Sequence, residues 1–499
     1  MSTNVKRILS LLLASLMLTS AVSCGADQSE TSKDTSSSSG SDSTAAETED
    51  QYLDDLPENL DFEGADIRIA HGSGGGFYVD IEEEDMSDPI VEAVWKRNNL
   101  LTERINVNIP APAEFPGGHK QFTTEVKNSI MANSDDYDVL VGYTRFHIQL
   151  AAEGLMKNLD LINYLDFEKD YWNEKYNENL SYNDIHYWAG GDISYSYISA
   201  ARGLFVNTTI WDQHYNDRLY DIVMEGNWTI DEMSKRIEGL YVDKNGDGQR
   251  DVDDFYGFIS DTTSLWVNCL MFGAGTSFTK YEEPGVPMLD IDSEHNIDVF
   301  NFYHDFLYNN PDAIYDDMYA KNVDMKSFVQ GKALIMNSCI GDIGDDIRNM
   351  DDTFIIVPAP KYDTVQAEYR VTQSDGFPLI GLPITANLDK LDAIGAALEG
   401  MASMGSSMVY PAYYETTLKD KYSRNPEAQE LIELMHDSII ADFCLTWSES
   451  IGYMGNSTIS VFSDNIHREN VVSMIEKNMK IFRKGIEMLF EDFEANSAN

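Results

Sequence analysis

The sequence is poor in basic side chains, in cysteine and in long apolar runs. Its 499 residues carry 35 Lys and Arg against 85 Asp and Glu, a formal net charge of −50. Nucleic-acid binding needs clustered Lys and Arg against the phosphates, so this charge argues against a nucleic-acid partner. A composition that is 43% apolar and 11% aromatic is typical of a folded globular protein. A chain of this length is expected to form at least two units, each with its own core.

The N-terminus has the pattern of an export signal. The stretch Ile8 to Ala21 follows Lys6 and Arg7 and is apolar over about 14 residues, too few for a membrane-spanning helix of about 20. It leads into Ala21-Val22-Ser23-Cys24, which resembles a bacterial lipoprotein box, in which the cysteine is lipidated. We therefore predict a lipoprotein signal peptide over residues 1–24 with Cys24 as the lipid attachment site. A soluble secreted form is the alternative.

A polar segment separates this signal from the rest of the chain. Residues 25–51 contain almost no apolar side chain and include a serine run at positions 36–39. Such a segment buries too little surface to offset its ordering entropy, so we predict a flexible tether. No later segment is apolar enough to span a membrane. The layout predicts a body, residues 52–499, held at the extracellular face of the cell membrane by a lipid anchor.

Cysteine is too scarce for a disulfide framework. With Cys24 assigned to the anchor, the body retains Cys269, Cys339 and Cys444, spread over about 175 residues. We predict three buried free thiols, and one bridge plus a spare thiol is the alternative.

Strand and helix patterns alternate from Asp66 onward. Residues 67–70 predict a strand, and Asp88 with Pro89 supplies an N-cap and a first-turn proline for a helix over 91–105. Further strands are expected at 107–109 and 137–143. This β-α-β order predicts a mainly parallel sheet covered by helices.

The C-terminal segment predicts a long amphipathic helix. Its apolar residues recur at steps of three and four: Val472, Ile475, Met479, Phe482, Ile486, Leu489 and Phe493. One apolar stripe of this kind packs on the body of a protein. A coiled-coil dimer is the alternative, but the repeat covers only about three heptads. We expect a monomer.

Several stretches in a fixed order resemble the family 1 extracellular solute-binding proteins of ABC importers, in particular the lipoproteins of Gram-positive anaerobes. Together they cover nearly the whole body: Ile90 to Ile109, Leu155 to Asn173, Leu219 to Met233, Phe328 to Asn337, Ile355 to Tyr369 and Ala396 to Tyr422. The resemblance implies an α/β fold of two lobes, periplasmic-binding-protein-like (type II), with crossing hinge strands and a C-terminal helical segment. The first lobe would hold about residues 55–200 and 370–430, and the second about 200–370 and 430–499.

The same resemblance implies a function. A substrate-binding lipoprotein of this family captures a carbohydrate between its lobes and delivers it to the permease subunits of an ABC transporter. A neutral oligosaccharide is favoured, because a net charge of −50 discourages anionic ligands. The alternatives are a receptor for peptides or other polar solutes, a sugar sensor that partners a histidine kinase, and a surface glycan-degrading enzyme.

One loop has the spacing of a calcium site. Residues 243–254 match D-x-[DN]-x-[DN]-G, with oxygen donors at loop positions 1, 3, 5, 7, 9 and 12. The six candidate ligands are Asp243, Asn245, Asp247, Gln249, Asp251 and Asp254. We predict a structural Ca²⁺ that joins two packed segments, although Asp254 is shorter than the Glu usual at position 12. A polar turn without an ion is the alternative.

Candidate ligand-binding residues are aromatic and polar side chains near predicted strand ends or in segments that the family fold brings to the cleft. Sugar sites combine flat aromatic faces with a few directed polar groups, and open α/β sheets bind ligands beyond the carboxyl ends of their strands. The candidates are Tyr78, Tyr143, Arg145, Asp192, Trp266, Asn337, Tyr413 and Trp447. For each of them a place in the core or on the surface is the alternative.

Catalytic and phosphate-binding motifs are not found. The sequence has no G-x-S-x-G and no H-E-x-x-H, and its nine His are dispersed. The glycine loop 72–76 lacks both phosphate-binding patterns and is expected to be a flexible loop. We predict a binding protein with no catalytic residues and no organic cofactor.

Overall fold

The computed structural model describes residues 52–72, 88–262, 264–316, 323–343, 347, 350–374, 377–418, 426–454 and 471–496. All of them belong to one compact unit, Thr48–Asn499. The predicted signal peptide, the lipid attachment site Cys24, the tether and the candidate Tyr78 lie outside the described residues.

The first sheet has the strand order β13-β5-β2-β4. Its strands are β2 (Ile69–His71), β4 (Ala113–Glu114), β5 (Val139–Tyr143) and β13 (Pro378–Gly381). β2 runs parallel to β4 and β5, as predicted, whereas β13 is antiparallel to β5. The reason is that the chain enters β13 from the second sheet and not through a covering helix. The first four residues of β5 are buried, as expected for a strand covered on both faces.

Helices cover this sheet, among them the helix that the sequence predicts over residues 91–105. Helix α2 (Pro89–Ile105) begins at Asp88, whose side chain accepts a hydrogen bond from the Ile90 N–H, and it ends at Asn106 in the left-handed region. The predicted helix and the short strand after it, β3 (Val107–Asn108), are therefore confirmed. The other covering helices and helical segments include α3 (His119–Ala132), α14 (Leu391–Met404), the π-helix Gly405–Val409 and α15 (Tyr410–Leu418).

The second sheet has the strand order β10-β7-β11-β6-β12. Its strands are β6 (Arg202–Asn207), β7 (Tyr256–Asp261), β10 (Ala313–Asp316), β11 (Ala333–Cys339) and β12 (Phe354–Val357). β7, β10 and β11 are parallel, and β6 is antiparallel to both β11 and β12. Every residue of β6, β7 and β11 is buried. The surrounding helices include α7 (Thr208–His214), α8 (Leu219–Met224), α9 (Ile230–Ile237), α10 (Ser264–Gly273), α11 (Glu294–Tyr308), α12 (Val323–Val329) and α16 (Pro426–Asp437).

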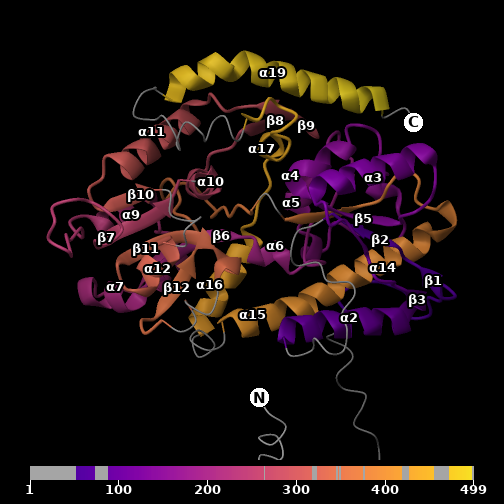
Figure 1. Cartoon of the computed structure of the whole chain (residues 1–499), viewed down its shortest axis with the longest axis horizontal. Coiled ribbons are helices and arrows are strands. Elements are labelled where there is room, and N and C mark those ends of the chain that lie inside the picture. The colour runs from indigo at the N-terminus through magenta and orange to yellow at the C-terminus, as the bar shows by residue number, and fades with distance from the viewer. Residues whose placement is uncertain are drawn as a thin grey trace, which may run out of the picture. The chain divides into compact units, whose positions relative to one another are not determined.

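Connecting segments join the two sheets at their carboxyl edges. The chain passes from the first sheet to the second through α6 (Ser196–Ser199), which lies between the sheets in Figure 1. It returns through residues 371–374 and Phe377, and residues 438–440 run beside this return, with Val371 and Ile439 paired in parallel. Backbone hydrogen bonds tie the two passages, from Arg202 N–H to Thr372 O (3.0 Å) and from Ser374 N–H to Ala200 O (2.9 Å).

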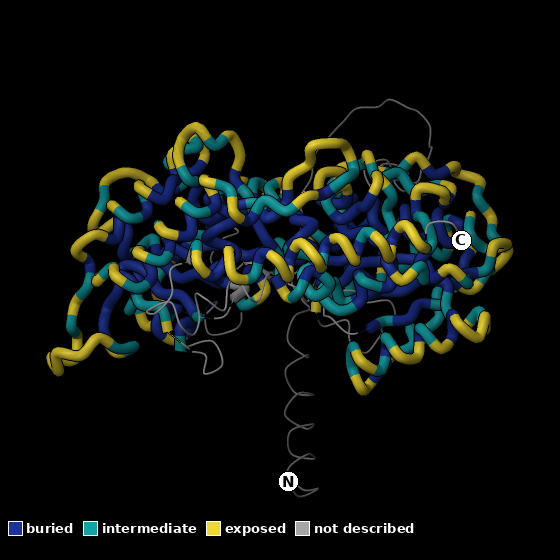
Figure 2. The backbone as a smooth tube through the Cα atoms, turned by 90° about the horizontal axis from the view of Figure 1, so that it is seen from above, coloured by how far each residue is buried: buried dark blue, intermediate teal, exposed yellow. Residues whose placement is uncertain are grey.

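The C-terminal helix α19 (Val471–Asn496) packs its apolar stripe on the body, as predicted. Ile475, Phe482 and Leu489 are at most 2% exposed. The Phe493 ring stacks on Tyr182 at a centroid distance of 4.5 Å. In Figure 1 this helix runs along the top of the view, and Figure 2 shows exposed residues on outer turns around a buried interior.

The three cysteines Cys269, Cys339 and Cys444 are free and buried, which confirms the prediction of three buried thiols. Burial raises the pKa of Cys269 to about 12 and that of Cys339 to about 11. None of the helices in the described ranges is long and apolar enough to span a membrane.

Candidate functional site

The carboxyl edge of the second sheet gathers two of the predicted binding residues. Strands β7 and β11 end there, the antiparallel β6 begins there, and α10 follows directly after β7. Asn337 on β11 is fully buried, and its side-chain amide donates to the Trp266 carbonyl at 2.8 Å and to Ser260 Oγ at 3.3 Å. The Trp266 ring, 3% exposed, is covered by the guanidinium of Arg202 at 3.9 Å from the ring centroid.

Polar atoms at this edge lack hydrogen-bond partners. They include Nε and Nη1 of Arg202 and the side-chain oxygens of Asn337, Thr372 and Gln373. Most buried polar groups in proteins are paired, because an unpaired one loses the hydrogen bonds that water would give it. A cluster of unpaired donors and acceptors at one sheet edge therefore marks a place where a polar ligand or ordered water supplies the missing bonds.

The carboxyl edge of the first sheet presents half-buried aromatic rings. Strand β5 ends at Tyr143, and the helix α4 (Thr144–His147) starts at the next residue. The Tyr143 and Phe146 rings lie 5.1 Å apart, and Phe146 stacks on His119 at 4.0 Å with an interplanar angle of 10°. Such faces suit the apolar side of a sugar ring.

The charged groups beside these rings are already paired. Arg145 donates from Nε to Glu449 at 2.9 Å, so its charge is compensated. His147 accepts the Tyr143 N–H at Nδ1, and burial lowers the pKa of this histidine to about 4. The imidazole is therefore neutral at physiological pH and helps to hold the turn after β5.

The two carboxyl edges lie on either side of the same return segment. At the first sheet, the Thr144 N–H donates to the Phe377 carbonyl at 3.1 Å. At the second sheet, Ala201, just before β6, pairs with Gln373. Only four positions separate Gln373 from Phe377, so both edges adjoin one short crossing of the chain.

Solved structures share the fold that carries these two edges. No protein-family model matches the chain, and no curated protein matches it by sequence. The cyclo/maltodextrin-binding protein complexed with maltotetraose aligns with 85% of this chain and 97% of its own, at 12% identity and a TM-score of 0.56. The maltose-binding periplasmic protein MalE from Listeria monocytogenes, in complex with maltose, aligns with 85% of this chain and 98% of its own, at 10% identity and a TM-score of 0.52. UgpB from Mycobacterium tuberculosis, in complex with glycerophosphocholine, aligns with 85% of this chain and 99% of its own, at 12% identity and a TM-score of 0.52.

The chain has the two-lobed fold of these solute-binding proteins. The predicted α/β, periplasmic-binding-protein-like fold is therefore confirmed. The first sheet with its helices is the core of the first lobe, and the second sheet is the core of the second lobe. In open α/β folds, ligands bind beyond the carboxyl ends of the strands, and here both such edges adjoin one crossing segment.

Three predicted binding residues lie in other surroundings. Asp192, 5% exposed, accepts a hydrogen bond from His436 Nε2 at 2.8 Å. Tyr413 stacks on Tyr195 at 5.5 Å. Trp447 is 2% exposed and lies 5.2 Å from Phe493 of α19, edge to face. The structure therefore brings together Trp266 with Asn337, and Tyr143 with Arg145, but not these three.

The Asp192–His436 pair joins the two lobes beside a cavity of about 550 Å³. Asp192 belongs to the first lobe, and His436 lies on α16, which packs on β12 of the second. Burial lowers the pKa of His436, but the charges and hydrogen bonds of Asp192 and Asp437 together outweigh it and raise this pKa to about 10. The cavity is lined by Glu168, Lys169, Asp170, Asn173, Glu174, Lys175, Asp192, Ser406, Tyr410, Glu433, His436 and Asp437.

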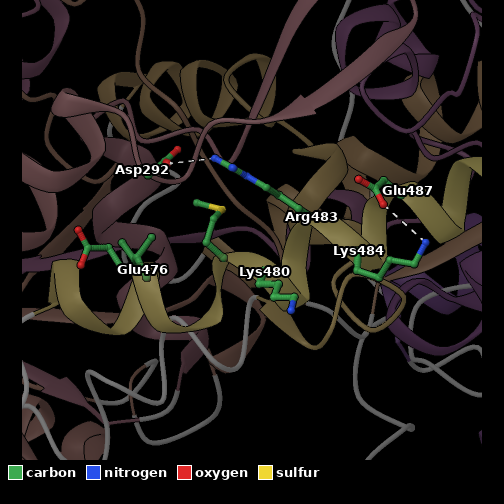
Figure 3. Close-up of a pocket in the computed structure, with 8 residues that line it drawn as sticks. Asp292, Glu476, Lys480, Arg483, Lys484 and Glu487 are labelled. Carbon is green, nitrogen blue, oxygen red and sulfur yellow. Dashed lines mark ion pairs between the residues drawn. The ribbon is translucent and has the colours of Figure 1, made fainter.

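A separate surface groove runs along α19. Its volume is about 570 Å³, and charged side chains line most of it (Figure 3). Arg483 pairs with Asp292 at 3.8 Å, and Lys484 pairs with Glu487 at 3.5 Å. These pairs neutralise much of the charge that faces the groove.

The predicted calcium loop folds around its oxygen donors. Asp243 accepts from the N–H groups of Gly246 (2.6 Å) and Gly248 (3.0 Å), and Asp247 accepts from the Gln249 N–H (2.7 Å). Gly248, at position 6 of the loop, has a φ of 73°, which the sharp turn requires. Within the described ranges, no three His, Cys, Asp or Glu side chains are gathered into a metal-ligating group. A calcium ion would therefore depend also on Asn245 and on backbone carbonyl oxygens, which are ordinary ligands for this ion.

Sequence reasoning missed Arg202, Phe146 and His119. Arg202 starts a strand whose antiparallel direction was not predicted, so its place at the carboxyl edge had no sequence signal. Phe146 follows the predicted candidates Tyr143 and Arg145, and the end of the buried strand run was the signal available there.

Proposed function

We propose that this protein is an extracellular substrate-binding protein that captures a carbohydrate between its lobes and delivers it to the permease of an ABC transporter. The observation that supports this most is the combination of aromatic faces at one carboxyl edge with unpaired hydrogen-bonding groups at the other. This combination matches the needs of a sugar, whose ring has apolar faces and a polar rim. It occurs in a fold whose solved relatives were captured with maltose and maltotetraose.

Ligand binding acts through the hinge. A sugar that contacts both lobes binds the closed form more tightly than the open one, so it shifts the population toward the closed form. The crossing segments at residues 196–202, 371–374 and 438–440 are where the chain absorbs this rotation. The permease then recognises the closed form, and no chemistry is performed on the ligand.

The anchor and the tether place the body at the membrane surface. Cys24 carries the lipid and residues 25–51 span the gap to the body in this proposal, which rests on the sequence pattern. The body is monomeric.

The loop of residues 243–254 holds a structural Ca²⁺ in this proposal. The spacing of Asp243, Asn245 and Asp247 supports it, together with the turn at Gly248 and the apolar segments on both sides. Asp254 also accepts hydrogen bonds from the Lys244 N–H and the Tyr241 hydroxyl, so it closes the loop with or without the ion.

Thermal melting of the purified protein against ligand panels tests the function. A ligand that binds only the folded state adds about 2.7 kcal/mol of stability at a hundredfold excess over Kd. We expect neutral oligosaccharides to raise the midpoint. If peptides alone raise the melting midpoint, the ligand is a peptide and not a carbohydrate. Release of shortened sugars would indicate a glycan-degrading enzyme. Stimulation of the transporter's ATP hydrolysis by the loaded protein, and not of a histidine kinase, tests the partner.

A further inference from the structure

The charged side chain of Arg202 is buried at the carboxyl edge of the second lobe without a compensating acid among the described residues. It is 3% exposed, and its Nε and Nη1 atoms have no hydrogen-bond acceptor. The face of the Trp266 ring, 3.9 Å from the guanidinium carbon, holds it in place. A buried guanidinium is normally paired, because taking it out of water without new hydrogen bonds is costly.

A second arginine of the same lobe shows the usual arrangement. Arg236 is 8% exposed and also lies against an aromatic ring, that of Tyr215 at 4.8 Å. It donates to both carboxylate oxygens of Asp217, at 2.7 and 2.5 Å, and to Glu232. The lack of partners at Arg202 is therefore a property of its position at the sheet edge.

Two unpaired side-chain oxygens lie on the segments that adjoin Arg202. Cys339 is its direct neighbour across the β6–β11 pairing, and Asn337, two residues earlier on β11, points to the same face. The side-chain oxygen of Asn337, which is fully buried, has no donor. On the crossing segment, the Thr372 carbonyl accepts a hydrogen bond from the Arg202 N–H. Thr372 is 5% exposed, and its side-chain hydroxyl is also unpaired.

This mixture of donors and acceptors discriminates between ligand classes. A hydroxyl group accepts from a guanidinium and donates to an amide oxygen at the same time, so sugar hydroxyls satisfy both kinds of group. A carboxylate satisfies only the guanidinium and faces the oxygen of Asn337.

We propose that Arg202, positioned by Trp266, is a specificity-determining residue that binds neutral sugar hydroxyls together with the acceptors Asn337 and Thr372. This inference rests on the proposed carbohydrate-binding function and assigns its substrate to the neutral sugars. The hydrogen bonds that Arg202 lacks in the free protein are formed with the ligand.

The test compares Arg202→Met with the matched control Arg236→Met in the full chain. Both substitutions keep an unbranched apolar stem and remove a buried guanidinium of the second lobe. The probes are maltotriose, cellotriose and xylotriose as neutral sugars and trigalacturonate as an acidic one, measured by isothermal titration calorimetry. The midpoint of thermal melting without ligand is the second readout.

We expect wild type to bind a neutral trisaccharide and R202M to weaken that binding at least tenfold, which corresponds to about 1.4 kcal/mol. R202M should melt at or above the wild-type midpoint, because an unpaired buried charge is removed. R236M should melt lower, since Asp217 and Glu232 lose their partner, and should keep the wild-type Kd within about twofold.

Other outcomes distinguish a failure of the role of Arg202 from a failure of the carbohydrate-binding function. If neutral sugars bind and R202M retains wild-type affinity, the role of Arg202 is refuted and the carbohydrate function stands; a lowered melting midpoint in that case would assign Arg202 to structure alone. If only trigalacturonate binds, the assignment to neutral sugars is wrong. If no sugar binds, the proposed function fails, and the inference about Arg202 fails with it.

Discussion

Replacing Glu399 by glutamine is expected to change how the stability of this protein depends on pH. Glu399 lies on α14 and is 2% exposed. Burial raises the pKa of this carboxyl from 4.5 to about 7, although hydrogen bonds from the Tyr171 hydroxyl and the Trp172 indole N–H oppose the rise. The folded state therefore binds this proton more tightly than the unfolded state.

The sign and size of the effect follow from linkage. Because the folded pKa is above the unfolded one, the stability that Glu399 contributes is fully present below about pH 4.5 and is lost as pH rises through 7. At about 1.4 kcal/mol per pH unit, the interval between 4.5 and about 7 corresponds to roughly 3 kcal/mol. Glutamine has the shape of the protonated acid and keeps both contacts, since its carbonyl accepts from Trp172 and its amide donates to the Tyr171 oxygen.

Urea unfolding followed by tryptophan fluorescence at pH 5, 6, 7 and 8 measures the effect. We expect E399Q to match wild type near pH 5 and to exceed it by roughly 2 to 3 kcal/mol at pH 8. D392N, at the exposed start of the same helix, is the control and should show a constant difference from wild type. A constant difference between E399Q and wild type over the whole range would refute the assignment of a raised pKa to Glu399.

Three further substitutions test other parts of the structure. H436Q removes the ion pair with Asp192. Because the pKa of His436 is raised to about 10, wild type should melt higher than H436Q at pH 7, and this difference in melting midpoint should disappear as pH rises through 10. A series of melting curves from pH 7 to 10.5 checks this. D243N removes a ligand from the proposed calcium loop. The melting midpoint of wild type should therefore be higher in Ca²⁺ than in EDTA, whereas that of D243N should be the same in both. Equal midpoints for wild type in the two buffers would exclude a stabilising ion. F146A removes a stacking face at the first carboxyl edge and should weaken sugar binding about fivefold to tenfold in calorimetry, whereas an unchanged Kd would place the ligand elsewhere.

The sequence predicts the local elements well where their signals are local. Asp88 and Pro89 mark the start of α2, and the apolar stripe from Ile475 to Phe493 defines α19, because caps and helical periodicity depend only on neighbouring residues. The antiparallel directions of β6 and β13 could not be predicted in this way. They arise from the passage of the chain between two sheets, and no spacing in the sequence encodes which strands become partners.

The binding residues were predictable only where their position depends on neighbouring residues. Tyr143 follows a buried strand, so its place at a carboxyl edge follows from the strand itself. Asp192 was expected near a strand end and Trp447 in a segment that the family fold brings to the cleft. Their partners, His436 and Phe493, come from distant segments that only the folded structure brings near.

The charges near the two edges explain how a protein of net charge −50 can present a site suited to a neutral ligand. At physiological ionic strength, a charge on the protein surface is screened beyond about 8 Å, so the ligand responds to its immediate surroundings. At the first edge, Glu449 compensates Arg145 at 2.9 Å. At the second edge, Arg202 lies beside Cys339, whose N–H is held by the carboxylate of Asp342. The cation of the first edge is thus paired within the protein, and the guanidinium of the second is open to hydrogen bonding, so hydrogen bonds, and not net charge, decide which ligand is held there.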